Sequence, residues 1–218
     1  MPNIKHILAT SLLALSTSFA NATVFNFISL TQGPGGLGES AWSTLGLTDG
    51  PLSISITGHA NNDNDNAQYA YLDWGNAGLG VCKDASSVNT AFTGSGTNRC
   101  NPSSDDNVTV AEYLRFSFNK DVVINNFWFN NNHDGGFGAG DQVTIGGTDY
   151  NVSTGYAGGA NGIGPFFVAA NTYIDVAYKN EEFYISGMEV NVREVSEPAT
   201  IALLGLSLIG VSAARRRK

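Results

Sequence analysis

The chain has 218 residues, a formal net charge of −8 and only 14% charged residues. Binding to a nucleic-acid backbone depends on Lys and Arg, so this acidic balance argues against nucleic acid as a partner, while it permits cation binding. The 26 glycines and the aromatic content of 11% favour strands and turns over helices. We therefore expect one mainly β domain between the two chain ends.

The sequence of residues 1–22 has the three parts of a secretory signal peptide. A short basic start precedes an apolar stretch over 7–15, and Ala20 and Ala22 form an A-x-A cleavage site. The apolar stretch is too short for a membrane-spanning helix. We expect export by the Sec machinery, with cleavage after Ala22 and Thr23 as the mature N-terminus.

The C-terminal residues 196–218 also have three parts, in a fixed order. The polar motif is Ser196-Glu197-Pro198, the uncharged apolar run covers 199–214, and the basic tail is Arg215, Arg216, Arg217 and Lys218. The apolar run predicts a single transmembrane helix about 24 Å long, which snorkelling basic side chains would extend. The positive-inside rule places the tail in the cytoplasm and the preceding domain across the membrane.

This tripartite end resembles the PEP-CTERM protein-sorting signal of Gram-negative bacteria. Glu197, Pro198, the helix and the basic cluster match the family pattern, and Ser196 replaces its first proline. The resemblance implies transient anchoring in the inner membrane, processing by an exosortase, and a destination at the cell surface or in the extracellular matrix, where exopolysaccharide is a candidate partner. The alternative is a plain anchor that is never processed, which would leave a membrane-anchored periplasmic protein.

The residues between the signals, 23–195, are expected to form one antiparallel β-sandwich of jelly-roll type. Strict alternation over 52–57 predicts a strand with Leu52, Ile54 and Ile56 inward, and a second alternating strand is expected over 113–118. Further strands are expected over 24–30, 69–74, 122–129, 142–145, 148–152, 166–168, 172–178 and 183–192.

The two cysteines, Cys82 and Cys100, are predicted to form a disulfide because the chain is exported. Closing a loop of this length would stabilise the fold by about 3 kcal/mol. The alternatives are a catalytic thiol or a metal site, and both lack a nearby histidine. The polar segment 84–107 is then a long surface loop that the disulfide ties down.

Asp105, Asp106 and Glu112 are the candidate metal ligands, because they lie where this long loop enters a strand. Ca2+ binds six to eight oxygens from carboxylates, amides and backbone carbonyls, and loops rich in Asp and Asn supply them. Residues 63–66 look like half an EF-hand loop, but the required sixth-position glycine and twelfth-position glutamate are missing. The alternative for all these residues is turn formation on a solvated surface.

Trp42 and Trp74 are the candidates for stacking on the sugar rings of a glycan, with core packing as the alternative. Trp128 lies between two phenylalanines, so alternation predicts that it faces away from them. His59 and His133 are the only histidines after the signal peptide, and the sequence has no G-x-S-x-G motif. We therefore expect a non-catalytic domain with a binding or structural role. The rival class is an extracellular polysaccharide hydrolase that uses paired carboxylates.

Overall fold

A computed structural model of the chain describes residues 22–32, 36–61, 68–85, 100, 102 and 106–193. Nearly all regular structure in these residues is β-strand, and their one helix is α1 (Phe27–Thr31). Within this part of the chain, no helix has the length and apolar character needed to cross a bilayer. The predicted signal peptide and the predicted helix over 199–214 lie outside the described residues.

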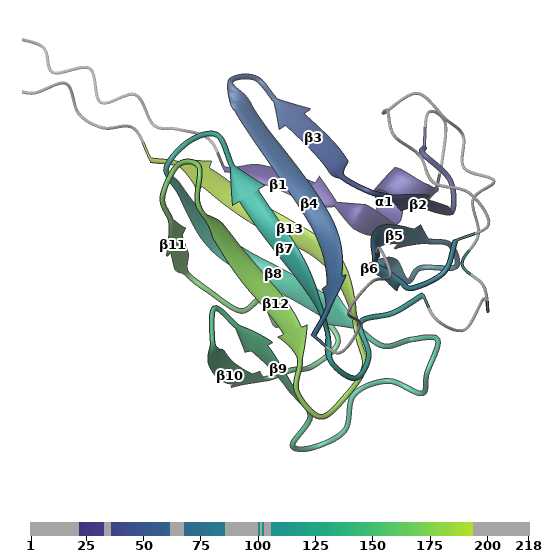
Figure 1. Cartoon of the computed structure of the whole chain (residues 1–218). Coiled ribbons are helices and arrows are strands. Elements are labelled where there is room, and N and C mark those ends of the chain that lie inside the picture. Colours follow the sequence, from purple (N-terminus) through teal and green to yellow (C-terminus); the bar gives the residue numbers. More distant parts are fainter. Residues whose placement is uncertain are drawn as a thin grey trace, which may run out of the picture.

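The described strands form two antiparallel sheets (Figure 1). The seven-stranded sheet contains β1 (Thr23–Asn26), β2 (Ser40–Trp42), β5 (Tyr69–Asp73), β6 (Gly78–Cys82), β8 (Val122–Asn130), β11 (Phe166–Val168) and β13 (Tyr184–Val192). The six-stranded sheet contains β3 (Leu45–Asp49), β4 (Leu52–Ala60), β7 (Glu112–Phe118), β9 (Gln142–Ile145), β10 (Thr148–Asn151) and β12 (Tyr173–Tyr178).

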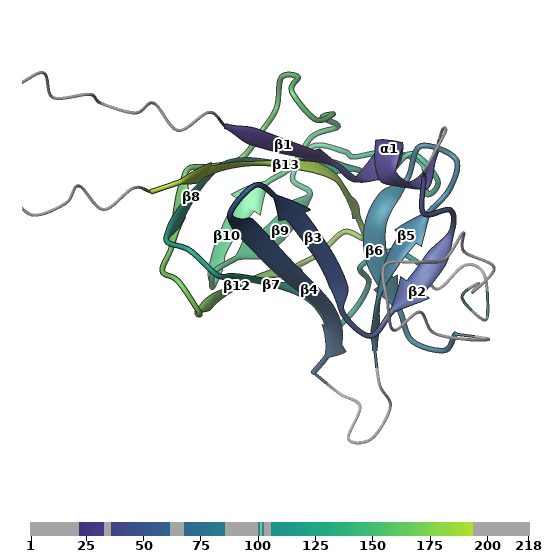
Figure 2. The same cartoon turned by 90° about the horizontal axis from the view of Figure 1, so that it is seen from above.

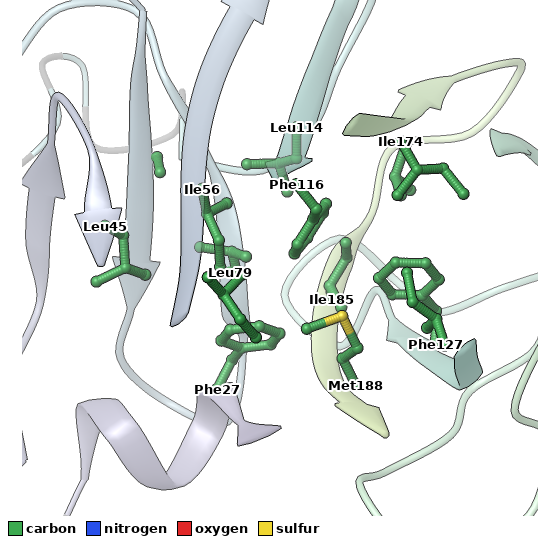
Figure 3. Packing of buried hydrophobic residues seen from close by; sticks show 14 of the residues in the cluster. Phe27, Leu45, Ile56, Leu79, Leu114, Phe116, Phe127, Ile174, Ile185 and Met188 are labelled. Atoms are coloured by element: carbon green, nitrogen blue, oxygen red, sulfur yellow. The ribbon is translucent and has the colours of Figure 1, made fainter. Parts of the chain in front are cut away.

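The strand order of the larger sheet is β11-β8-β13-β6-β5-β2, with β1 added beside β13, and that of the smaller sheet is β10-β9-β12-β7-β4-β3. Figure 2 shows β1, β8 and β13 on one side of the domain and β4, β7 and β12 on the other. One apolar core joins the two layers (Figure 3): the rings of Phe116 on β7 and Phe127 on β8 have centroids 5.2 Å apart. The prediction of antiparallel β-sheets is confirmed, and the shared core fits a β-sandwich.

The six-stranded sheet buries one face and exposes the other. Leu52, Ile54 and Ile56 are buried as predicted, and Leu114 and Phe116 of the neighbouring strand alternate in the same way. The intervening side chains of β4, β7 and β12 lie on the outer face and are exposed or half-buried. Buried and exposed side chains therefore alternate along the strands of this sheet, as expected when only one face is covered.

The seven-stranded sheet is instead covered on both faces along much of its length. All of β6 is buried, and so is Trp128, which faces away from the core residues Phe127 and Phe129 as alternation predicts. Trp128 is buried on that face because segment 155–163 lies over it: the indole Nε1 donates to the Gly159 carbonyl at 3.0 Å. The Ser186 hydroxyl also donates to the Gly155 carbonyl at 2.7 Å, which holds this segment on the sheet.

The first strand is shorter than the sequence predicted. It ends at Asn26, whose side-chain Oδ1 accepts a hydrogen bond from the Ser29 amide at 2.9 Å and caps the short helix α1. Strand β1 pairs antiparallel with β13, with Thr23 opposite Val190. The first and the last strand of the domain therefore lie side by side.

The predicted disulfide between Cys82 and Cys100 is present, with a Cα–Cα distance of 5.6 Å. Cys82 is the last residue of β6, and the Cys100 amide donates to the Tyr71 hydroxyl at 3.3 Å. Both cysteines are buried with Ala41 and Tyr71 in a small second apolar cluster. The disulfide thus fixes Cys100, which lies within the polar segment 84–107, against the β5–β6 region.

Replacing Gly80 with alanine should destabilise the domain by about 1–3 kcal/mol, because strand β6 has no room for a methyl group there. A Cβ at this position would overlap the carbonyl oxygen of Asp106, a backbone atom that cannot move freely. Gly46→Ala on β3 is the matched control, since a Cβ there meets nothing within 4 Å. Urea unfolding of both variants measures the difference, and equal stabilities would contradict this account of the packing.

Candidate functional site

Acidic side chains gather where several loops meet, at the C-terminal ends of β5 and β8 and the N-terminal end of β13. An antiparallel bridge between Val108 and Phe183 brings the segment around Asp106 beside the start of β13. We call the following residues the acidic loop cluster: Asp73, Asp106, Asn107, Asn131, His133, Asp134, Glu181, Glu182 and Tyr184. They come from four separate segments of the chain, and contacts among their side chains tie these segments together.

Asp73 and His133 form the only ion pair among the described residues of the acidic loop cluster. Asp73 is 5% exposed, and its Oδ1 accepts a hydrogen bond from the Trp74 amide at 2.7 Å. Its Oδ2 lies 3.1 Å from His133 Nδ1, close enough for charge attraction but without hydrogen-bond alignment, so this buried oxygen has no hydrogen-bond partner. His133 Nε2 lies 3.0 Å from the Gly75 carbonyl oxygen.

Burial changes the acidity of two of the aspartates in this cluster, Asp73 and Asp106. Burial, and then repulsion from Asp106, raises the pKa of Asp73 to about 7, although His133 pulls it down. Burial also raises the pKa of Asp106, and the hydrogen bond from the Tyr184 hydroxyl at 2.6 Å opposes that rise. The Tyr184 phenol has a raised pKa because of burial and of this same bond. The cluster therefore holds protons that exposed carboxylates would release.

Two buried asparagines place unpaired amide oxygens among these carboxylates. Asn107 is 2% exposed, and its Nδ2 donates to Asp134 Oδ2 at 3.1 Å and to Glu182 Oε2 at 2.9 Å. Asn131 is also buried, and its Nδ2 donates to Glu181 Oε1 at 3.0 Å. The Oδ1 atoms of both asparagines are buried without a hydrogen-bond partner. Such oxygens, beside carboxylates, are the ligands that Ca2+ prefers.

The three predicted metal ligands have different surroundings. Asp105 lies outside the described residues, and Asp106 belongs to the acidic loop cluster. Glu112 is buried, and its Oε2 accepts a hydrogen bond from the Thr109 amide at 3.0 Å in the turn before β7. Among the described residues, no three His, Cys, Asp or Glu side chains converge as metal ligands. Glu182 was not singled out from the sequence, and only the fold brings Asp134 and Glu182 to Asn107.

The two tryptophans proposed for glycan stacking differ in exposure. Trp42 is 1% exposed, and its indole Nε1 donates to Ser40 Oγ at 2.9 Å. A buried indole offers no face to a sugar, so the Trp42 prediction is wrong and the core-packing alternative holds. Trp74 follows β5 and is 54% exposed, so its ring is accessible.

Residues 194–218 match the family described as the PEP-CTERM protein-sorting motif. The match includes Ser196, Glu197 and Pro198, the residues on which the sequence resemblance was based. The chain is therefore a protein with a PEP-CTERM sorting domain, and this motif implies an exported protein that an exosortase sorts to the cell envelope or surface. No curated protein and no solved structure matches the chain.

Replacing Asp73 with asparagine should flatten the pH dependence of stability between about pH 4 and pH 7. The unfolded carboxyl ionises near its ordinary pKa of 3.8, whereas the folded one does so near 7. The folded state binds the extra proton in this window, so the free energy of unfolding of the wild type falls as pH rises through it. Asparagine cannot ionise, so the free energy of unfolding of Asp73→Asn should rise most, relative to that of the wild type, at pH 8.

Urea unfolding at pH 4.5, 6 and 8 measures this difference. Asp84→Asn is the control, because it removes the same charge at an exposed position. The raised pKa would be contradicted if the free energy of unfolding of the wild type, relative to that of Asp73→Asn, increased from pH 4.5 to pH 8.

Proposed function

We propose that this chain is a surface or extracellular-matrix protein of a Gram-negative bacterium, with a passenger domain over 23–195. The passenger is a jelly-roll-like β-sandwich, and residues 199–214 anchor it transiently in the inner membrane before exosortase processing. The sorting-motif match at 194–218 is the observation that carries this proposal. The position of β1 supports a signal peptide over 1–22, because the strand begins at Thr23, directly after the expected cleavage site.

The passenger domain acts by binding or by structure rather than by catalysis. Two observations support this: His133 contacts Asp73 and a backbone carbonyl, whereas His59 stacks on Tyr113 with ring centroids 4.8 Å apart and has its Nε2 2.7 Å from the Thr57 hydroxyl oxygen. Neither contact set contains the serine that a hydrolytic triad needs. The rival hydrolase has one favourable observation, the raised pKa of two neighbouring carboxyls, Asp73 and Asp106. Polysaccharide turnover that Asp106→Asn abolishes would replace our proposal with that rival.

Pro198→Ala should block C-terminal processing in a host that has an exosortase, because it removes half of the Glu-Pro pair that the motif presents. Mass spectrometry of the exported chain gives the readout. The wild type should lack the tail from Arg215 to Lys218, whereas the variant should retain it. Ser196→Pro is the matched variant, since it restores the family's first proline, and it should be processed at least as well as wild type. An intact tail on the wild type would establish the plain-anchor alternative instead.

Ca2+ is one candidate ligand, and the acidic loop cluster is where it would bind. A cation there would be bound by Asp134, Glu182 and the buried amide oxygen of Asn107 once that side-chain amide turns over, together with backbone oxygens. Turning the amide exchanges a donor for an acceptor beside two carboxylates, which is favourable only when a cation sits among them.

Millimolar Ca2+ should therefore raise the melting temperature of the full-length chain, since a ligand that binds only the folded state stabilises it. The double variant Asp134→Asn/Glu182→Gln should lose this rise, and Asp84→Asn should keep it. Calorimetric titration with CaCl2 provides the second readout. The absence of both heat and thermal shift in the wild type would eliminate this ligand.

A further inference from the structure

The outer face of the six-stranded sheet carries an ordered array of polar and aromatic side chains. Its register is set by β4, β7 and β12, which pair in adjacent antiparallel positions. Because side chains alternate across a sheet, the residues between the buried positions all project from this one face. The three rows across the strands are Ser55–Ser117–Tyr173, Thr57–Arg115–Asp175 and His59–Tyr113–Ala177.

Tyr173 is a rigid aromatic platform at the edge of this array. Its side chain is 56% exposed, and the Arg115 Cζ lies 3.7 Å from its ring centroid. Arg115 is itself fixed by two hydrogen bonds to Asp175, from Nε to Oδ1 at 2.8 Å and from Nη2 to Oδ2 at 2.9 Å. The ring is therefore held in place by a stacked guanidinium while much of it remains open to solvent.

Two hollows meet at the row that contains Tyr173. The larger has a volume of about 560 Å³ and includes Tyr173 in its wall. The smaller has a volume of about 310 Å³ and includes Ser117, the residue opposite Tyr173 on β7. The lining of the larger hollow includes rings from β10, β11 and β12 and the two glycines of the β9–β10 turn: Tyr150, Phe166, Phe167, Tyr173, Gly146 and Gly147. The smaller is lined by Ser53, Ser55, Ser117, Phe118, Asn119 and Asn171.

The charge of this face favours a neutral ligand. Arg115 is paired with Asp175, and Lys179, directly after β12, is paired with Asp149 at 2.7 Å. The positive charges of both side chains are therefore largely balanced by neighbouring carboxylates, which disfavours binding of a free carboxylate or sulfate. What remains for a ligand is a set of hydroxyls and amides on one side of Tyr173 and a set of rings on the other.

We propose that this face binds a neutral polysaccharide, with Tyr173 as the central stacking platform. Pyranose rings present apolar C–H faces that pack on aromatic rings and hydroxyls that hydrogen-bond to Ser and Asn side chains. The larger hollow takes one end of the bound segment, where Phe167 adds a second ring that is 54% exposed. The smaller hollow takes the other end. This inference rests on the proposed binding role of the passenger and gives that role a site and a ligand class.

The test is calorimetric titration of the full-length chain with cellohexaose, laminarihexaose and chitohexaose, and with an alginate hexamer as the anionic comparison. We expect binding of at least one neutral oligosaccharide. Tyr173→Ala should weaken that binding about tenfold or more, and Tyr173→Phe should retain most of it, since the stacking ring survives. Thermal unfolding of each variant verifies that it is folded.

Two exposed aromatics elsewhere supply comparison variants. Tyr156→Ala is the control variant: it removes a ring that is 48% exposed and lines neither hollow, so it should bind like wild type. Trp74→Ala removes the 54% exposed ring of the rival stacking candidate, which also lines neither hollow. The proposal is overturned by the absence of heat with all three neutral oligosaccharides, by binding of alginate alone, or by loss of binding in Trp74→Ala but not in Tyr173→Ala. None of these results would alter C-terminal processing, so failure here is distinguishable from failure of the sorting proposal.

Discussion

Unequal burial of the two sheets is the constraint on which the rest of this domain depends. The six-stranded sheet contributes only its inner face to the core, whereas strands such as β6 are buried on both sides. The backbone segments that cover the larger sheet approach it closely, and the contact of Asp106 with Gly80 requires a residue without a Cβ. Covering one sheet leaves the outer face of the other as a broad, regular surface. A ligand that needs rigid, evenly spaced partners finds them there, on strands rather than on loops.

This asymmetry also explains which parts of the fold the sequence could predict. Strands β4 and β7 were predictable because one buried face imposes a strict alternation, and the same alternation correctly placed Arg115 and Ser117 on one side. Strand β6 has no alternation to detect, since Gly78-Leu79-Gly80-Val81-Cys82 is buried throughout and its glycines resemble those of a loop. The burial of Trp128 was not predictable for a related reason, because the segment that covers its face of the sheet follows about 30 residues later in the chain.

The candidate sites depend on contacts that no local pattern contains. Asn107 meets Glu182 across 75 positions of sequence and Asp134 across 27, so the acidic loop cluster becomes visible only when the segments are assembled. Asp106 was predictable as an acidic residue at the start of a strand, but its neighbours were not. Likewise, alternation shows which residues of β12 point outward, yet only the β7–β12 register sets Asp175 against Arg115. Sequence alternation predicts the face of the sheet on which a side chain lies, whereas the strand order and register determine which side chains are adjacent across strands.

The sorting signal and the proposed ligand-binding face lie in separate parts of the chain. The sorting motif follows β13 in the sequence, and β13 pairs with β1, the first strand of the domain. Both of these strands belong to the seven-stranded sheet, whereas Tyr173 and the smaller hollow belong to the six-stranded sheet, and the larger hollow adds only β11 and the residue before it from the other sheet. Removal of the C-terminal signal therefore needs no change in the residues that would hold a glycan. On the proposed sorting route, a passenger built this way would bind its proposed ligand both before and after removal of the C-terminal signal.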